Sequence, residues 1–209
     1  MSKTFGGCLL VVVVVAVLVL GVGAWVAGQY NGLVRDQQAV QSAWAQVENV
    51  YQRRFDLIPN LVETVKGVAA FEKETYTAVA EARAKVGQIR LSAEDLQDPQ
   101  AFRRLEAAQG ELSSVLSRLL AVAENYPQLK ANQNFLDLQT QLESTENRIA
   151  VERRRFNEIA QGYNTRIRSF PTNLIAGVFG FQPRAYFESA SGADVAPKVD
   201  FGTAQPAPR

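Results

Sequence analysis

The sequence contains no histidine and a single cysteine, and these two shortages exclude most catalytic and metal chemistry. Imidazole is the usual proton carrier near neutral pH and a common ligand of zinc and iron. Its absence excludes Ser-His-Asp and Cys-His hydrolases, zinc hydrolases and the di-iron bundles built on Glu-x-x-His. With Cys8 as the one thiol, the soluble part can form neither a disulfide nor a thiolate metal site. The residues therefore predict no catalytic constellation, no cofactor and no metal site.

An excess of charge of either sign is also missing. Lys and Arg number 22 against 21 Asp and Glu, so the formal net charge is +1. A chain with this balance has no excess positive charge that would attract nucleic acid electrostatically, and we expect no nucleic-acid partner. The 209 residues, 47% of them hydrophobic, can form one folded domain with a core in addition to a membrane segment.

Residues 8–27 form a run without any charge. At about 1.5 Å per residue this run spans roughly 30 Å, which is the thickness of the hydrocarbon core. It predicts a transmembrane helix that contacts lipid, preceded by a short tail of residues 1–7. A cleaved secretory signal is the alternative, but the run exceeds the usual length and only Lys3 precedes it. Trp25 and Tyr30 lie where such a helix would leave the lipid, and the flanking charges do not decide its orientation.

Apolar positions recur at helical spacing over residues 29–58, which predicts a first soluble helix. The sequence Asp-Leu-Ile-Pro-Asn at 56–60 is expected to end it, because proline removes a backbone donor. Asn60 and Glu63 then form a capping box for a second helix, which runs to about Arg90.

Two further helices follow. Asp98-Pro99 offers an N-cap and a proline at the first helical position, so a third helix is expected to start there. Asn125-Tyr126-Pro127 marks its end. The fourth helix has the most regular pattern, with apolar residues seven apart from Phe135 onward, and it runs to about Ser169.

The apolar stripe of the fourth helix also contains Thr145 and Glu152. Two polar groups are therefore expected to be partly buried and to need partners. A structural hydrogen-bond network is one interpretation, and catalysis by a buried Glu152 carboxylate is the other.

Four helices joined by short breaks predict an all-α fold, in which a transmembrane helix is followed by an antiparallel up-and-down four-helix bundle over residues 28–188. This topology places the turns at 56–60 and 125–134 together at the membrane-distal end and returns the fourth helix to the bilayer. Residues 189–209 are rich in Ala, Gly and Pro and are expected to form a disordered tail.

Two surfaces follow from this topology. Polar residues of the distal turns are candidates for binding a protein partner, with helix capping as the alternative role. They are Asp56, Asn60, Asn125, Lys130 and Asn132. The apolar segment 170–181 would lie near the bilayer and either rest in the lipid interface or pack across the end of the bundle. The candidate lipid-contacting residues are Arg166, Arg168, Phe179, Phe181 and Arg184.

Motifs over residues 30–188 resemble the LemA family of bacterial membrane proteins. The segments that carry the resemblance are Tyr30-Asn31-Gly32-Leu33-Val34, Ala43-Trp44, Arg54, Asp56-Leu57-Ile58-Pro59-Asn60-Leu61-Val62, Glu81-Ala82-Arg83-Ala84, Glu124-Asn125-Tyr126-Pro127, Leu129-Lys130-Ala131-Asn132, Asn134-Phe135, Thr145-Glu146-Asn147-Arg148-Ile149, Tyr163-Asn164 and Phe170-Pro171. One departure is Phe156-Asn157, where the family tends to have Tyr-Asn. The resemblance implies a single-pass protein of the bacterial cytoplasmic (inner) membrane with an antiparallel four-helix domain and a poorly defined role.

Three functional hypotheses follow. The first is a non-enzymatic, membrane-tethered module that binds a protein or serves as a scaffold at the bacterial envelope. The second is a membrane-remodelling or lipid-surface-binding protein that uses residues 170–181. The third is an enzyme based on carboxylates or a Ser-Lys pair, for which no strained nucleophile turn or Gly-rich phosphate loop is visible. Partner identity, homo-oligomerisation and the side of the membrane that the domain faces stay open.

Overall fold

The computed structural model describes residues 2–66 and 73–188, and within these ranges the chain is helical with no strand. The α-helices are α1 (Ser2–Lys66), α2 (Lys73–Gln88), α3 (Pro99–Ala123), α4 (Pro127–Lys130), α5 (Gln133–Arg168) and α6 (Thr172–Phe179), and a short 3-10 helix, η1 (Asp95–Gln97), precedes α3. The all-helical class predicted from the sequence is confirmed. The predicted tail at 189–209 lies outside the described residues.

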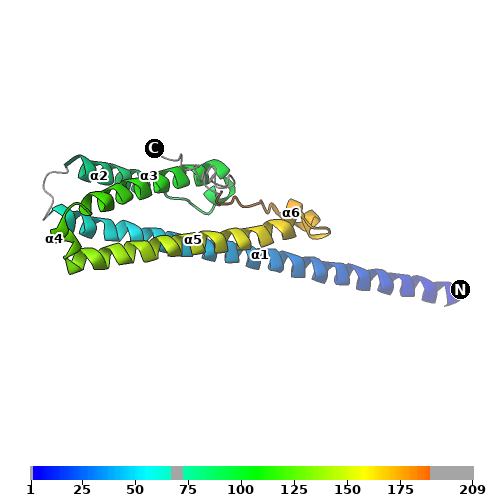
Figure 1. The fold of residues 1–209 in the computed structure, drawn as a ribbon. Coiled ribbons are helices and arrows are strands. Elements are labelled where there is room, and N and C mark those ends of the chain that lie inside the picture. The colour runs from blue at the N-terminus through cyan, green and yellow to red at the C-terminus, as the bar shows by residue number, and fades with distance from the viewer. Residues whose placement is uncertain (1, 67–72, 189–209) are drawn as a thin grey trace, which may run out of the picture.

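Helix α1 is far longer than the others and projects out of the molecule at its N-terminal end (Figure 1). Among the described residues it is the helix that is long and apolar enough to cross a membrane, and none of its most apolar stretch is buried. It begins at Ser2, so the segment expected to be a short tail is helical from that residue on. No other part of the described protein covers this stretch, as expected of a segment that contacts lipid.

The predicted break at 56–60 is wrong, because α1 continues through Pro59 to Lys66. Pro59 is exposed, whereas Ile58, Leu61 and Val65 are buried on the other side of the helix. Burying each such side chain stabilises the fold by about 1.5–3 kcal/mol, which together outweighs the roughly 3 kcal/mol cost of proline inside a helix. Asn60 therefore caps no helix, and its carbonyl accepts a hydrogen bond from the Thr64 hydroxyl at 2.8 Å.

Helices α1 and α5 form a long antiparallel pair. Arg166 pairs with Asp36 near one end of the contact, at 2.7 Å, and Glu146 pairs with Arg54 further along, at 2.5 Å. The residue number falls along α5 as it rises along α1, which defines the antiparallel orientation. The fourth helix of the sequence analysis is thus confirmed as α5, with its end at Arg168.

Helices α2 and α3 form a second antiparallel pair that packs on the first (Figure 1). Lys85 of α2 and Glu111 of α3 are joined by an ion pair at 2.6 Å. The predicted start of α3 is confirmed, because the Asp98 carboxylate accepts a hydrogen bond from the Gln100 amide at 2.8 Å and Pro99 is the first helical residue. The second helix begins at Lys73 and not at Asn60, and it ends at Gln88.

The four longest helices alternate in direction along the chain (Figure 1). Their side chains form two buried clusters, one around Trp44 and Phe156 nearer the apolar end of α1, and one around Leu61 and Phe135 at the opposite end. The most extensive backbone contacts are within the pairs α1–α5 and α2–α3. The regular up-and-down four-helix bundle stays a prediction.

The chain after α5 turns back along the molecule. Helix α6 ends at Phe179 and is followed by Gly180, whose positive φ of 74° a residue with a side chain would adopt only with strain. Residues 181–188 then run back along α5 without helical structure, and we call this segment the strap. Asn164 bonds both the amide and the carbonyl of Arg184, at 2.7 and 2.8 Å, and Asn157 does the same for Phe187, at 2.9 and 2.8 Å.

Candidate functional site

The end of the helical domain opposite the apolar run of α1, which we call the distal end, is built from the last turns of α1 and the connection between α3 and α5. Ile58, Leu61 and Val65 from α1 share one buried cluster with Leu129 and Phe135. Both segments that the sequence singled out therefore lie at the end of the molecule opposite the apolar part of α1 (Figure 1). The path differs from the expected one, since residues 56–60 reach this end as helix and the other connection contains the short helix α4.

The polar residues predicted to bind a partner differ in what they do locally. Four of them are exposed: Asp56, Asn60, Asn125 and Lys130. The Asp56 carboxylate accepts a hydrogen bond from Gln52 at 2.7 Å, one helical turn earlier. Asn132 is only half-exposed, and its side chain caps α5 by accepting a hydrogen bond from the Phe135 amide at 3.3 Å. Asn132 thus has the capping role that was the alternative for the whole set.

At the other end of the molecule, α6 has one face packed and one face exposed. Ile175 and Ala176 are buried against the core, whereas Phe170, Leu174 and Val178 are 80%, 61% and 81% exposed. Leu174 and Val178 are four apart in α6, so their side chains lie along one side of the helix, and Phe170 lies in the turn before it. The two interpretations of this segment are therefore compatible: it packs across the end of the helices and still presents an apolar surface, which we call the α6 face.

An aromatic contact joins α6 to the place where α1 leaves its uncharged run. The Tyr30 ring lies 4.9 Å from the ring of Phe179 and 5.7 Å from that of Phe181, measured between ring centres. Tyr30 and Phe179 are partly exposed at 37% and 53%, and Phe181 is half-buried against the core. This cluster places the α6 face beside the end of the predicted membrane span.

The basic residues predicted to contact lipid are distributed between surface and interior. Arg168 is exposed. Arg166 is half-buried and pairs with Asp36, and its guanidinium lies over Gly32, where a Cβ atom would collide with it. The absence of a side chain at Gly32 therefore gives Arg166 the room to reach Asp36.

Arg184 is buried, with 5% exposure, because Asn164 holds its backbone against α5. Its guanidinium donates a hydrogen bond to the Ala93 carbonyl at 3.2 Å and lies 5.7 Å from the centre of the Tyr163 ring. This group is directed into the protein, so we do not propose it further as a lipid contact.

Arg54 is a central polar residue that the sequence analysis named among the family motifs without giving it a structural role. It is 2% exposed and donates hydrogen bonds from one nitrogen to Glu146 at 2.5 Å and to Ser113 at 3.0 Å, which links α1, α5 and α3. A signal was present, since Arg54 lies three residues after Tyr51 and four before Ile58, at core spacing. A basic residue at such a position predicts a buried ion pair.

Burial also changes the pKa values of ionisable groups near Arg54. It raises the pKa of Tyr51 to about 12, against the opposing effect of Arg153 and Arg54. Burial likewise raises the pKa of Glu106, an effect that the ion pair with Arg153 opposes. These groups belong to a packed interhelical network between α1, α3 and α5.

The two polar residues on the α5 stripe differ in their surroundings. Thr145 is 1% exposed, and its hydroxyl donates to the Gln141 carbonyl at 2.7 Å, which is a purely local bond. Glu152 is half-buried beside Arg53 and Arg148 in a shallow cavity. Within the described ranges, no group of three or more Asp, Glu or Cys side chains is placed to hold a metal ion.

The family profile and the curated relatives that match this chain agree with one another. The profile of the LemA family matches residues 43–201. The magnetosome protein MamQ 2 of Paramagnetospirillum magneticum is 30% identical over 195 residues, which cover 84% of this chain and 72% of the relative. MamQ of Magnetospirillum gryphiswaldense is 29% identical, over 79% of this chain and 67% of the relative. Protein LemA of Metamycoplasma hominis is 27% identical, over 83% and 76%.

Proposed function

We propose that this chain, which belongs to the LemA family, is a single-pass, membrane-anchored interaction module that presents its distal end to a protein partner. The observation that carries the proposal is the unbroken course of α1 from the uncharged run to Lys66. At about 1.5 Å per residue, the distal end stands roughly 60 Å from residue 27. A scaffold of this shape meets a partner well beyond the bilayer surface.

The residues at the distal end support this role. Asp56, Asn60, Asn125 and Lys130 expose acidic, amide and basic groups together on one end of the molecule. Charged and polar groups of both signs fix register and specificity in protein contacts. The proposal includes the bacterial cytoplasmic membrane, one crossing of it and a four-helix bundle as the rigid body. No reaction is assigned to the chain.

The test is site-specific photocrosslinking of the full-length protein in native membranes. A photoreactive amino acid replaces Asn60 or Lys130 at the distal end, and Glu94, an exposed residue near η1, serves as the membrane-near control. We expect the two distal positions to give adducts with the same protein and Glu94 to give none. Equal adducts from all three positions, or none from the distal pair, would count against the proposal.

A charge change sharpens this test. With the crosslinker at Asn60, Lys130→Glu is expected to lower the adduct yield because it reverses one exposed charge of the distal end. The matched control is Arg155→Glu, which reverses the charge of an exposed arginine on the side of α5. A loss of yield that is the same for both variants would mean that the contact is not at the distal end.

A second candidate function is binding to the lipid surface through α6. It is favoured by the exposure of Phe170, Leu174 and Val178 beside the predicted span. An apolar helical face at this depth, next to the exposed Arg168, matches a helix that lies in the membrane interface. In this role α6 would fix the orientation of the helical domain relative to the bilayer plane, or it would act on the bilayer itself.

Quenching by lipid tests the second function in the full-length chain. An environment-sensitive fluorophore is attached at Val178→Cys in a Cys8→Ser background, in nanodiscs with shallow spin-labelled lipids. The control is Val151→Cys, because Val151 is also an exposed valine, at 54%, but lies on α5 away from α6. We expect strong quenching at 178 and little at 151. Equal, weak quenching at both positions would exclude lipid contact by α6.

A further inference from the structure

The strap ends beside a cavity that neither proposed function uses. Glu188, the last described residue, borders a space of about 400 Å³. Gly110 and Ser113 of α3 line this space on one side, and Ile149 and Glu146 of α5 line it on the other. The groove between α3 and α5 that holds the strap therefore continues past the end of the strap towards the distal end.

The strap is an extended chain that lies along α5. Asn164 binds Arg184 and Asn157 binds Phe187, so three strap residues cover the same length as seven helix residues. At about 3.3 Å per extended residue and about 1.5 Å per helical residue, both lengths are about 10 Å. The strap runs antiparallel to α5, and its direction leads from Asn157 towards Glu146 and the cavity.

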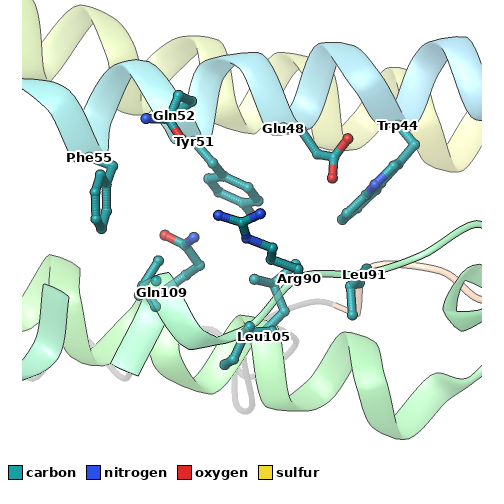
Figure 2. A pocket seen from close by; sticks show the side chains of 12 residues that line it. Trp44, Glu48, Tyr51, Gln52, Phe55, Arg90, Leu91, Leu105 and Gln109 are labelled. Atoms are coloured by element: carbon teal, nitrogen blue, oxygen red, sulfur yellow. The ribbon is translucent and has the colours of Figure 1, made fainter. Parts of the chain in front are cut away.

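Other cavities do not lie on this path. A wider one of about 530 Å³ is located between α1 and the α2–α3 pair, where Trp44, Phe55 and Arg90 line it and Glu188 does not (Figure 2). A third, of about 390 Å³, does border Glu188, but it extends back beside the strap as far as Gln161. The position and direction of the strap thus select the cavity between α3 and α5.

The sequence after Glu188 suits an extended course in a narrow groove. Residues 189–193 are Ser, Ala, Ser, Gly and Ala, so no side chain larger than that of serine enters the cavity there. Apolar and mostly polar residues then alternate, which is typical of an extended segment with one apolar side. The residues of the apolar side are Val195, Pro197, Val199 and Phe201.

The family profile includes the same segment. It matches residues 43–201 and so extends 13 residues beyond Glu188 (201 − 188 = 13). Residues 202–209 lie outside the match. A sequence pattern typical of the family thus ends where the alternation ends, which favours a common structural role for 189–201.

The register of the strap predicts where the apolar side arrives. Val195 comes eight residues after the strap residue that Asn157 holds, which is about 26 Å of extended chain. The same length is about 18 residues of helix. Because α3 runs opposite to α5 and Arg153 pairs with Glu106, this level on α3 is Leu120. Leu120 is half-buried at the edge of the distal cluster.

We propose that residues 189–201 of the same chain occupy the groove between α3 and α5 as a continuation of the strap. Residues 189–193 fill the cavity, and the apolar side of 194–201 packs on Leu120, which lies seven residues after Ser113 and so on the same side of α3. Phe201 then reaches the connection between α3 and α5, and residues 202–209 leave the groove at the distal end.

Two spin labels measure whether the segment is docked. Ala107→Cys, at an exposed position of α3, and Asp200→Cys carry the labels in a Cys8→Ser background, in the full-length protein in nanodiscs. Residue 200 is 12 residues beyond Glu188 (200 − 188 = 12), so docking should give a narrow distribution near about 40 Å. A freely moving chain of this length would give a broad distribution near about 20 Å. Pulsed electron paramagnetic resonance distinguishes the two.

Matched variants locate the contact. Gly110→Leu places a large side chain in the cavity, and Gly162→Leu places one on α5 away from it; a Cβ atom at either glycine meets no neighbour within 4 Å. We expect Gly110→Leu to shift the distance from about 40 to about 20 Å and Gly162→Leu to leave it unchanged. Val199→Asn should also shift it, whereas Lys198→Asn, on the other side of the segment, should not. Thermal unfolding confirms that each variant is folded.

The same measurements can overturn the inference, and they read only the position of the segment, so they do not depend on either proposed function. A broad distribution near about 20 Å in the unaltered protein would mean that the segment is not docked. A long, narrow distance that survives in folded Gly110→Leu would place the segment elsewhere. Loss of the long distance on dilution with unlabelled protein would show that the segment of a second copy fills the groove.

Discussion

Arg54 is the most buried charged side chain of the described part of the protein, and it is paired asymmetrically. The Arg54 side chain is 2% exposed, whereas that of its partner Glu146 is 43% exposed. Removing either partner breaks the same ion pair, but the charge left behind differs in its access to water. A carboxylate at the surface is solvated, whereas a buried guanidinium keeps its desolvation cost.

We therefore predict unequal losses from the two deletions. Glu146→Ala should lower the free energy of unfolding by about 3 kcal/mol, because it leaves Arg54 buried with Ser113 as its remaining hydrogen-bond partner among the described residues and no counter-charge. Arg54→Met keeps most of the buried volume and should cost about 1 kcal/mol. Chemical denaturation of the full-length protein in detergent measures both values. A larger loss for Arg54→Met would contradict this account.

Tyr51 provides a second prediction at the residue scale. The unfolded chain releases the Tyr51 proton near its ordinary pKa of 10.0, but burial raises the pKa in the folded protein to about 12. The contribution of the protonated Tyr51 to the free energy of unfolding is complete below pH 10. It is lost as the pH rises to 12, because in that range the unfolded state holds fewer protons than the folded state. Tyr51 should contribute a fall of about 1.4 kcal/mol per pH unit in this window.

The matched variant Tyr51→Phe isolates this contribution from other groups that titrate at high pH. We expect the free energy of unfolding of the wild type to fall more steeply than that of the variant between pH 10 and 12, and the two to run parallel below pH 9. Denaturant titrations at a series of pH values provide the comparison. Parallel curves throughout would show that the Tyr51 pKa is not raised.

Among the elements, α1 is unusual in containing a proline that does not end it. Pro59 lies on the exposed side, while its neighbours Ile58 and Leu61 are buried with residues of α3, α4 and α5. Packing of the buried side maintains a helix that local propensity disfavours. The consequence is a continuous rod from the apolar run to the distal end.

Substitution of Pro59 distinguishes a continuous helix from a break. In the middle of a helix, Pro59→Ala restores a backbone hydrogen bond and removes a steric clash, so it should raise the free energy of unfolding by about 1–3 kcal/mol. At the first position of a new helix, the same change would be neutral or destabilising. The midpoint of chemical denaturation decides between the two.

The strap shows how a segment without secondary structure is held in place. Asn157 and Asn164 are seven residues apart on α5, so their side chains lie on one side of the helix. Each pairs with both backbone groups of one strap residue, Phe187 and Arg184. The Phe187 ring consequently packs between Trp44, Phe102 and Phe156. A polar pair at heptad spacing thus adds an aromatic residue to the core.

For the whole molecule, the continuous helix α1 predicts a long and fixed distance. Spin labels at Gly28→Cys and Lys66→Cys, in a Cys8→Ser background, should be about 55–60 Å apart with a narrow distribution. Both positions are exposed, and a Cβ atom at Gly28 meets no neighbour within 4 Å. Pulsed electron paramagnetic resonance in nanodiscs measures this distance. A turn at 56–60 would instead bring the labels to about 40 Å.

Local patterns of the sequence were sufficient for several features. The uncharged run, the N-cap at Asp98 and the heptad spacing of α5 depend on residues near in sequence, and each predicted a helix or a helix end that the structure confirms. The resemblance to the LemA family rested on short motifs and is also confirmed. Helical period and capping chemistry are local properties, so one sequence suffices to recognise them.

Other features were decided by contacts between residues far apart in sequence. Pro59 stays helical because distant helices bury its neighbours, and Arg184 is buried because Asn164 holds the strap. Arg54 pairs with a residue on another helix, and the α6 face is exposed because Ile175 and Ala176 take up the packed side. The sequence by itself determined that the described chain is helical and which segment is apolar, but it misplaced the end of α1 and the start of α2. Periodicity predicted the burial of Thr145 on the stripe of α5, but only the tertiary structure decided that Arg54 and Arg184 are buried and that the apolar residues of the α6 face are not, because burial depends on the whole set of packed elements.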